Sequence, residues 1–173
     1  MRCQDLNGQA RARKARDSSG RSRTSGCRGT SERIRGLRIR AGRSHAQLAQ
    51  ALGINAAWYA DLERDDEHLT STLSLFQAMQ LASVLGVQLH ELFGAGHPEP
   101  RIALIDLPDL VVAHAHRERL TIEQLGQVLG WEMRDFIDSP IQAATVLPIR
   151  FLQDLSAALG IDWLALVPDP DEI

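Results

Sequence analysis

The side chains best suited to chemistry in this chain are six histidines, two cysteines and an acidic run, and their spacing matches no catalytic motif. His114 and His116 would point to different faces of a helix, so they could not share one metal ion. Both cysteines lie in the first thirty residues, without the C-x-x-C or Cys/His spacing of a zinc site. The acidic run at residues 65–67 lacks the spaced ligands of a calcium loop, so we expect it to be a solvated loop. We therefore expect no metal, no cofactor and no enzymatic activity.

A second group of polar residues stands where helices should begin. Ser44 and Gln47 have the spacing of a capping box, in which each side chain satisfies a free backbone N–H of the first turn. A tight turn follows at residues 53–54, and Asn55 can cap the next helix. Two capped helices joined by a short glycine turn are the helix-turn-helix pattern.

The rest of the first half continues this helical pattern. Ser31 can cap a first helix that ends at Gly42. A polar loop is predicted over residues 65–72, and a second capping box opens a helix at residues 74–85. A short helix over residues 88–93 is the last of five.

The second half repeats the first. The segment GRSHAQLAQALGI matches RLTIEQLGQVLGW with an offset of 77 residues, and LSLFQAMQLASVLGVQLHELF matches LPIRFLQDLSAALGIDWLALV with an offset of 74. Because caps, turn glycines and core leucines all coincide, the sequence predicts an all-α fold of two tandem five-helix bundles. The expected organisation is a disordered basic tail (1–30), a first domain (31–94), a linker (95–106), a degenerate second domain (107–168) and a C-terminal tail (169–173).

Charge is distributed unevenly along the chain. Residues 1–33 carry nine basic and three acidic side chains, whereas residues 97–173 carry five basic and thirteen acidic ones. The tail has three interpretations: a basic arm that tracks phosphates, an organellar transit peptide, or sequence upstream of the true start codon. No apolar run is long enough to span a membrane, and the lack of cysteine in the predicted domains fits a reducing cytoplasm.

The segments LRIRAGRSHAQLAQALGINAAWYADLER and LSLFQAMQLASVLGVQLHELF resemble the phage-repressor (Xre/Cro) helix-turn-helix family. This resemblance implies a five-helix bundle that binds double-stranded DNA, usually as a homodimer, with the helix at residues 56–64 in the major groove. It places phosphate contacts at helix N-termini and base contacts on the exposed side of that helix. The residues that match the family's DNA-contacting positions, or flank them, are Arg43, His45, Asn55, Ala56, Ala57, Trp58, Asp61 and Arg64.

The resemblance also implies a structural ion pair. The family often pairs an arginine on its first helix with a glutamate at the end of its third, and Arg38 and Glu63 fill these positions. Their expected role is to brace the recognition helix. In the second repeat the equivalent residues are Ala115 and Pro140, so both partners have been lost together.

The chemistry of the recognition helix leaves two functions open. Ala56 and Ala57 offer only apolar contact with a thymine methyl group, and Asp61 would repel phosphates. Trp58 is either a contact residue, for DNA or for a protein partner, or a side chain folded back onto its own bundle. The predicted function is a DNA-binding transcriptional regulator, and the alternative is a protein-interaction adaptor or antitoxin-type module. The acidic segment EMRDFIDS suggests that the second repeat serves dimerisation or partner binding.

Overall fold

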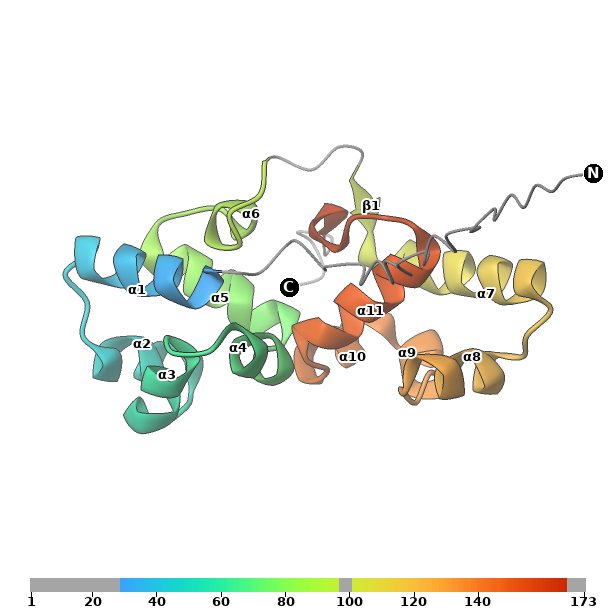
Figure 1. Ribbon diagram of the computed structural model, residues 1–173, viewed down its shortest axis with the longest axis horizontal. Helices are drawn as coiled ribbons and strands as arrows, with labels where there is room; N and C mark the ends of the chain where they lie inside the picture. The colour runs from blue at the N-terminus through green and yellow to red at the C-terminus, as the bar shows by residue number, and fades with distance from the viewer. Residues whose placement is uncertain (1–28, 97–100, 168–173) are drawn as a thin grey trace, which may run out of the picture.

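The chain is mostly helical, as the sequence predicts. The computed structural model describes residues 29–96, here called the first half, and residues 101–167, the second half (Figure 1). Of the tail expected at residues 1–30, residues 1–28 lie outside the described residues, as does the whole tail expected at 169–173. The first half consists of α1 (Thr30–Arg40), α2 (His45–Leu52), α3 (Ala56–Leu62), α4 (Asp66–Thr72), α5 (Leu75–Leu85) and α6 (Leu89–Leu92). The second half consists of β1 (Ile102–Ala103), η1 (Leu104–Asp106), α7 (Leu107–Glu118), α8 (Ile122–Leu129), α9 (Arg134–Asp138), α10 (Pro140–Val146), α11 (Ile149–Leu159), η2 (Trp163–Ala165) and β2 (Leu166–Val167).

The predicted capping boxes are present. Helices α2, α5 and α8 each begin at a hydroxyl side chain that accepts a hydrogen bond from the third residue of the helix, whose own side chain bonds back. Helix α2 ends at Gly53, whose φ of 69° lies in the left-handed region that glycine adopts without strain. The three capping boxes are Ser44–Gln47, Ser74–Gln77 and Thr121–Gln124.

The prediction of a polar loop at residues 65–72 is wrong, because residues 66–72 form helix α4. The Asp65 side chain caps it by accepting a hydrogen bond from the Glu67 backbone N–H at 2.9 Å. Leu69 and Thr70 are buried on its inner side. A single apolar side chain among acidic and hydroxyl residues carries little periodicity, so this short helix depends on tertiary burial.

The acidic run also caps a second helix. Helix α1 begins at Thr30 with Gly29 as its cap, so the prediction of Ser31 as the cap is wrong. The carboxylate of Asp66 accepts from the Gly29 N–H at 2.6 Å and from the Ser31 N–H at 2.7 Å. The free N–H groups at the start of α1 are therefore satisfied by an acid distant in sequence, and not by the side chain of Ser31.

The expected linker at residues 95–106 contains structure in its second part. Strand β1 pairs in parallel with β2, with Ile102 opposite Leu166, and Leu104 in η1 is fully buried. These contacts fasten the start of the second half to its end.

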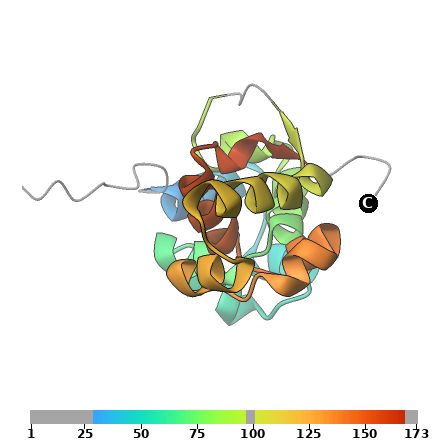
Figure 2. The ribbon, with the colours of Figure 1, turned by 90° about the vertical axis from the view of Figure 1, so that its right-hand side faces the viewer.

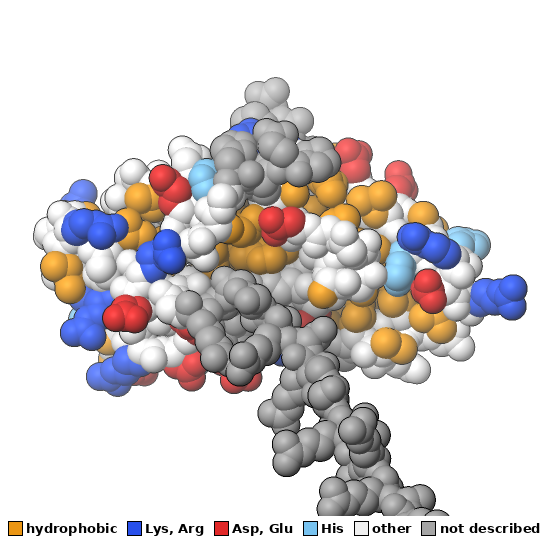
Figure 3. All heavy atoms as spheres, turned by 45° about the horizontal axis from the view of Figure 1, so that its top comes forward, with side chains coloured by type: hydrophobic (Ala, Val, Ile, Leu, Met, Phe, Trp, Pro, Cys, Tyr) orange, Lys and Arg blue, Asp and Glu red, His pale blue; other side chains and the backbone are white. Residues whose placement is uncertain are grey.

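The α-helices of the two halves occur in a similar order of lengths along the chain. Each half has its own hydrophobic core, and α4 and α5 of the first half pack against α11 and α10 of the second. Figures 1 and 2 show the resulting arrangement, in which α2–α3 and α8–α9 lie at opposite ends of the same, lower side. Hydrophobic side chains gather near the middle of the face seen in Figure 3. Phe93 of the first half and Trp163 of the second meet edge to face, with ring centroids 4.7 Å apart.

Replacing Asp66 tests the cap between α4 and α1. Asp66→Ala should lower the free energy of unfolding by about 1–2 kcal/mol, the usual cost of losing a helix cap. Chemical denaturation measures this loss. Glu67→Ala, an exposed acid on the same turn, is the matched control. Equal effects of the two substitutions would contradict the assignment.

Candidate nucleic-acid interface

Helices α2 and α3 form the candidate interface, and their inner faces hold them together. Leu48 and Ala49 of α2 are buried against Tyr59 and Leu62 of α3. Asn55 caps α3 by accepting a hydrogen bond from the Trp58 N–H at 2.7 Å. The helix-turn-helix is therefore fixed by one packed face and two capped ends.

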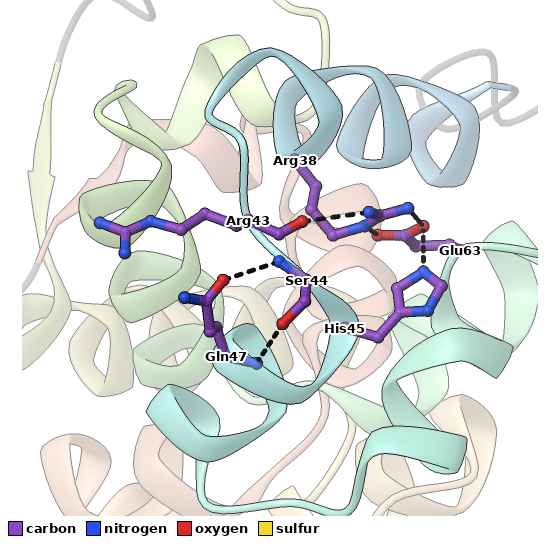
Figure 4. Close-up of polar contacts among 6 residues, drawn as sticks. All are labelled: Arg38, Arg43, Ser44, His45, Gln47 and Glu63. Atoms are coloured by element: carbon purple, nitrogen blue, oxygen red, sulfur yellow. Dashed lines mark hydrogen bonds and ion pairs between the residues drawn. The ribbon is translucent and has the colours of Figure 1, made fainter.

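A buried ion pair ties α3 to α1. The guanidinium of Arg38 donates from Nε to Glu63 Oε1 at 2.6 Å and from Nη2 to Glu63 Oε2 at 2.9 Å (Figure 4). The Glu63 side chain is 4% exposed and that of Arg38 is 13% exposed. Arg38 also donates to the backbone carbonyl of Arg43 at 3.2 Å, which connects the pair to the loop before α2. Such bidentate geometry combines charge with fixed orientation.

His45 joins this pair from the first turn of α2. Its Nε2 lies 3.1 Å from Glu63 Oε2, and its ring lies 5.8 Å from that of Tyr59. The sequence placed His45 among the phosphate contacts and did not connect it with Glu63. A histidine and a glutamate eighteen residues apart give no local signal for this contact.

The network shifts the pKa values of its members. Burial pushes the pKa of Glu63 upward, but the hydrogen bonds from Arg38 and His45 outweigh it and hold the pKa below its ordinary value of 4.5. The Glu63 hydrogen bond raises the pKa of Arg38, and burial raises that of the Tyr59 phenol. Glu63 is thus held as a carboxylate at neutral pH.

The outer side of α3 is open to solvent. Asn55, Ala56, Ala57, Trp58 and Asp61 are all exposed, and the indole of Trp58 belongs to neither core. At 38% exposure, Trp58 is among the large apolar side chains that remain accessible. The structure therefore places these predicted contact residues together on one accessible surface.

Two arginines flank this surface. The side chain of Arg43 is exposed and points away from the Glu63 network in Figure 4. Arg64 donates from Nη1 to Asp61 Oδ1 at 2.8 Å, and both side chains are largely exposed. Asp61 thus offsets the charge of Arg64 at the C-terminal end of α3.

Comparison with protein families agrees with this geometry. A family model described as "Helix-turn-helix domain" matches residues 31–92. Residues 31–92 are a helix-turn-helix domain. The match covers the first half of the described chain, and this domain is of a DNA-binding type consistent with the Xre-like resemblance. Comparisons with the curated proteins and with the solved structures gave no match.

The region of the second half that the 77-residue sequence offset pairs with the Glu63 network is apolar inside and acidic outside. The offset pairs Arg38, Tyr59 and Glu63 with three buried residues, and His45 with a half-buried one. These are Ala115, Phe136, Pro140 and Ile122, respectively. A shallow pocket between α8 and α9 is lined by Ile122, Glu123, Glu132, Arg134 and Asp135.

No group of histidine, cysteine and acidic side chains in residues 29–96 and 101–167 could hold a metal ion. None of the helices in that part of the chain has the length and apolar character needed to cross a membrane.

Removing one partner of the buried ion pair should destabilise the first half. Arg38→Met leaves the Glu63 carboxylate buried without its guanidinium, which costs about 3–5 kcal/mol. Thermal and denaturant unfolding measure this change, and Arg35→Met, exposed on the same helix, is the control. The double variant Arg38→Met, Glu63→Met should lose less than Arg38→Met alone. A single variant as stable as the control would contradict a structural role.

The lowered pKa of Glu63 predicts a pH dependence of stability. A carboxyl group whose pKa is lower in the folded state stabilises the protein above its ordinary pKa, and this contribution is lost as pH falls through the folded value. The stability difference between wild type and Glu63→Gln should therefore shrink as the pH falls below 4.5. Denaturant titrations from neutral to acidic pH measure it, and a constant difference would refute the prediction.

Proposed function

We propose that the protein is a transcriptional regulator that inserts α3 of the helix-turn-helix domain into the major groove of DNA. The observation that carries this proposal is the exposed side of α3, which the buried Arg38–Glu63 pair holds rigidly while leaving Trp58 accessible. A recognition helix must present its outer side to base edges without bending, and this arrangement meets that requirement. A regulator of this kind acts where DNA is found, which we take to be the cytoplasm, and we propose no catalytic activity.

Phosphate contacts would surround the helix. Arg43 stands before α2, Asn55 stands at the start of α3, and His45 keeps its imidazole 42% exposed beside Glu63. Arg64 can reach a phosphate when it exchanges its exposed pairing with Asp61, because such surface pairs contribute little stability. Ala56 and Ala57 would meet thymine methyl groups, so sequence preference would depend on apolar contact and DNA shape.

We also propose that the second half is a degenerate copy of the domain. Helix α8 has the length of α2, α10 that of α4 and α11 that of α5, and the bounds are displaced by the offsets found in the sequence. The capping boxes of α2 and α8 correspond, as do the glycines that end α5 and α11. Loss of the ion-pair residues and the acids gained from α8 through α9, at Glu123, Glu132 and Asp135, support a copy that no longer reads DNA.

A protein-interaction adaptor is the second candidate function. It is favoured by the outer side of α3, where two alanines and a tryptophan lie beside an acid paired with an arginine. Exposed tryptophan is common at the centre of protein interfaces. Under this function α3 would bind a protein partner in place of a base pair.

A DNA selection assay on the full chain tests the proposed function. An enriched duplex that binds about a thousandfold more tightly than a scrambled control would establish sequence-specific recognition. Salt titrations on both duplexes separate base contacts from the charge of the tail. Folded protein that enriches no sequence would refute the regulator, and a pull-down would then test the adaptor.

Neutralising Asp61 should tighten DNA binding if α3 lies in the groove. Asp61→Asn removes a charge that repels phosphates and releases Arg64, so we expect about a fivefold lower Kd. Fluorescence anisotropy with the selected duplex measures it. The control is Asp109→Asn, the same change at an exposed position on α7. Equal effects of both substitutions would place α3 away from the DNA.

The substitution Trp58→Ala distinguishes a role of Trp58 in DNA binding from a role in folding. Because Trp58 lies outside both cores, the substitution should change the unfolding midpoint little while it weakens DNA binding about tenfold or more. Binding and denaturation measured on the same sample distinguish the two effects. A large loss of stability with unchanged binding would show that Trp58 is a structural residue.

A further inference from the structure

The two halves meet as the two subunits of a symmetric dimer meet. In such an interface, every contact occurs twice. If one element of the first subunit contacts a second element of its partner, then the second element of the first subunit contacts the first element of the partner. Here α4 packs against α11, and α10, which corresponds to α4, packs against α5, which corresponds to α11. The contacts within this single chain are therefore reciprocal.

The backbone shows the same reciprocity at the centre of the interface. Ser74, which precedes α5, forms an antiparallel bridge with Pro148, which precedes α11. Beside the bridge, the Ile149 N–H donates to the Leu73 carbonyl at 2.7 Å. Because Ser74 and Pro148 occupy the same position in their halves, the bridge joins a residue to its own counterpart.

Each half also places a side chain in the core of the other. Leu75 of α5 is fully buried in the core of the second half, and Ile149 of α11 is fully buried in the core of the first. These two residues again correspond in position. Leu89 and Trp163, a further corresponding pair, each pack against both cores.

This arrangement brings α3 and α9 to the same side of the molecule (Figures 1 and 2). The two helices each carry a formal charge of −1, but the segments that contain them differ, because Asp61 is the one charged Asp, Glu, Lys or Arg from α2 through α3. In the second half the exposed charged residues from α8 through α9 are mostly acidic, and these are Glu123, Glu132, Arg134, Asp135 and Asp138. Glu132 takes the place of Asn55, where the first half would meet a phosphate.

We propose that the second half takes the place of a second subunit, so that one chain acts alone and reads one half-site through α3. The part of this proposal that concerns DNA rests on the proposed function. Helix α9 then lies where a partner's recognition helix would lie, over the neighbouring stretch of duplex, and its acids contact no phosphate. The protein is a monomer that recognises an asymmetric DNA site, in contrast to the homodimer that the family resemblance implies.

Mass and hydrogen exchange test the built-in partner without DNA. Sedimentation equilibrium of the full chain should give the monomer mass of 19.1 kDa. Leu75→Val and Ile149→Val each remove one methylene group, a change mild enough to preserve the fold. Leu75→Val should speed amide exchange in α7–α9, and Ile149→Val should speed it in α1–α3. A dimer mass, or effects confined to the half that carries the substitution, would overturn the proposal.

Charge neutralisation tests the position of α9 over DNA. The triple variant Glu132→Gln, Asp135→Asn, Asp138→Asn should tighten binding of the selected duplex about tenfold, with the preferred sequence unchanged. The control neutralises three exposed acids outside α8 and α9: Asp106→Asn, Asp109→Asn and Glu118→Gln. Equal effects of the two triple variants would overturn the placement of α9. If the wild type binds no DNA, the proposed function fails, while mass and exchange still decide whether the second half is a built-in partner.

Discussion

The burial of one carboxylate organises the helix-turn-helix domain. Glu63 follows the last residue of α3 in a site that excludes most solvent, so its charge has to be met by donors from other elements. Arg38 supplies two of them from α1, and His45 supplies another from α2. Because Arg38 and His45 lie on different helices, satisfying the carboxylate sets the position of α3 relative to both neighbours.

The second half is apolar at the positions that the 77-residue sequence offset pairs with this network. Ala115 and Phe136, which the offset pairs with Arg38 and Tyr59, are both buried. Phe136 packs edge-on against Phe151, with ring centroids 5.0 Å apart, and Phe151 also meets Trp131. Aromatic packing is less directional than a bidentate ion pair, so it holds the helices of the second half together with fewer constraints on their surface residues.

The packing between the halves has consequences for both. With Leu75 and Ile149 exchanged between the cores, neither half can unfold without opening a cavity in the other. Packing against the second half therefore contributes to the stability of the DNA-binding domain, even though the outer surface of the second half carries an excess of acids.

Much of the local structure follows from the sequence alone. Capping boxes such as Ser44–Gln47 and the terminating Gly53 act within a few residues, so their spacing predicted the helix ends. The pair of Arg38 with Glu63 was predicted through family resemblance, and Trp58 was left with two interpretations. Helix α4, the cap of α1 by Asp66 and the bond of His45 to Glu63 were missed. Each joins residues far apart in the sequence or depends on burial by distant helices, which periodicity does not encode. The exchange of Leu75 and Ile149 belongs to the same class, because a buried leucine has the same pattern whichever core receives it.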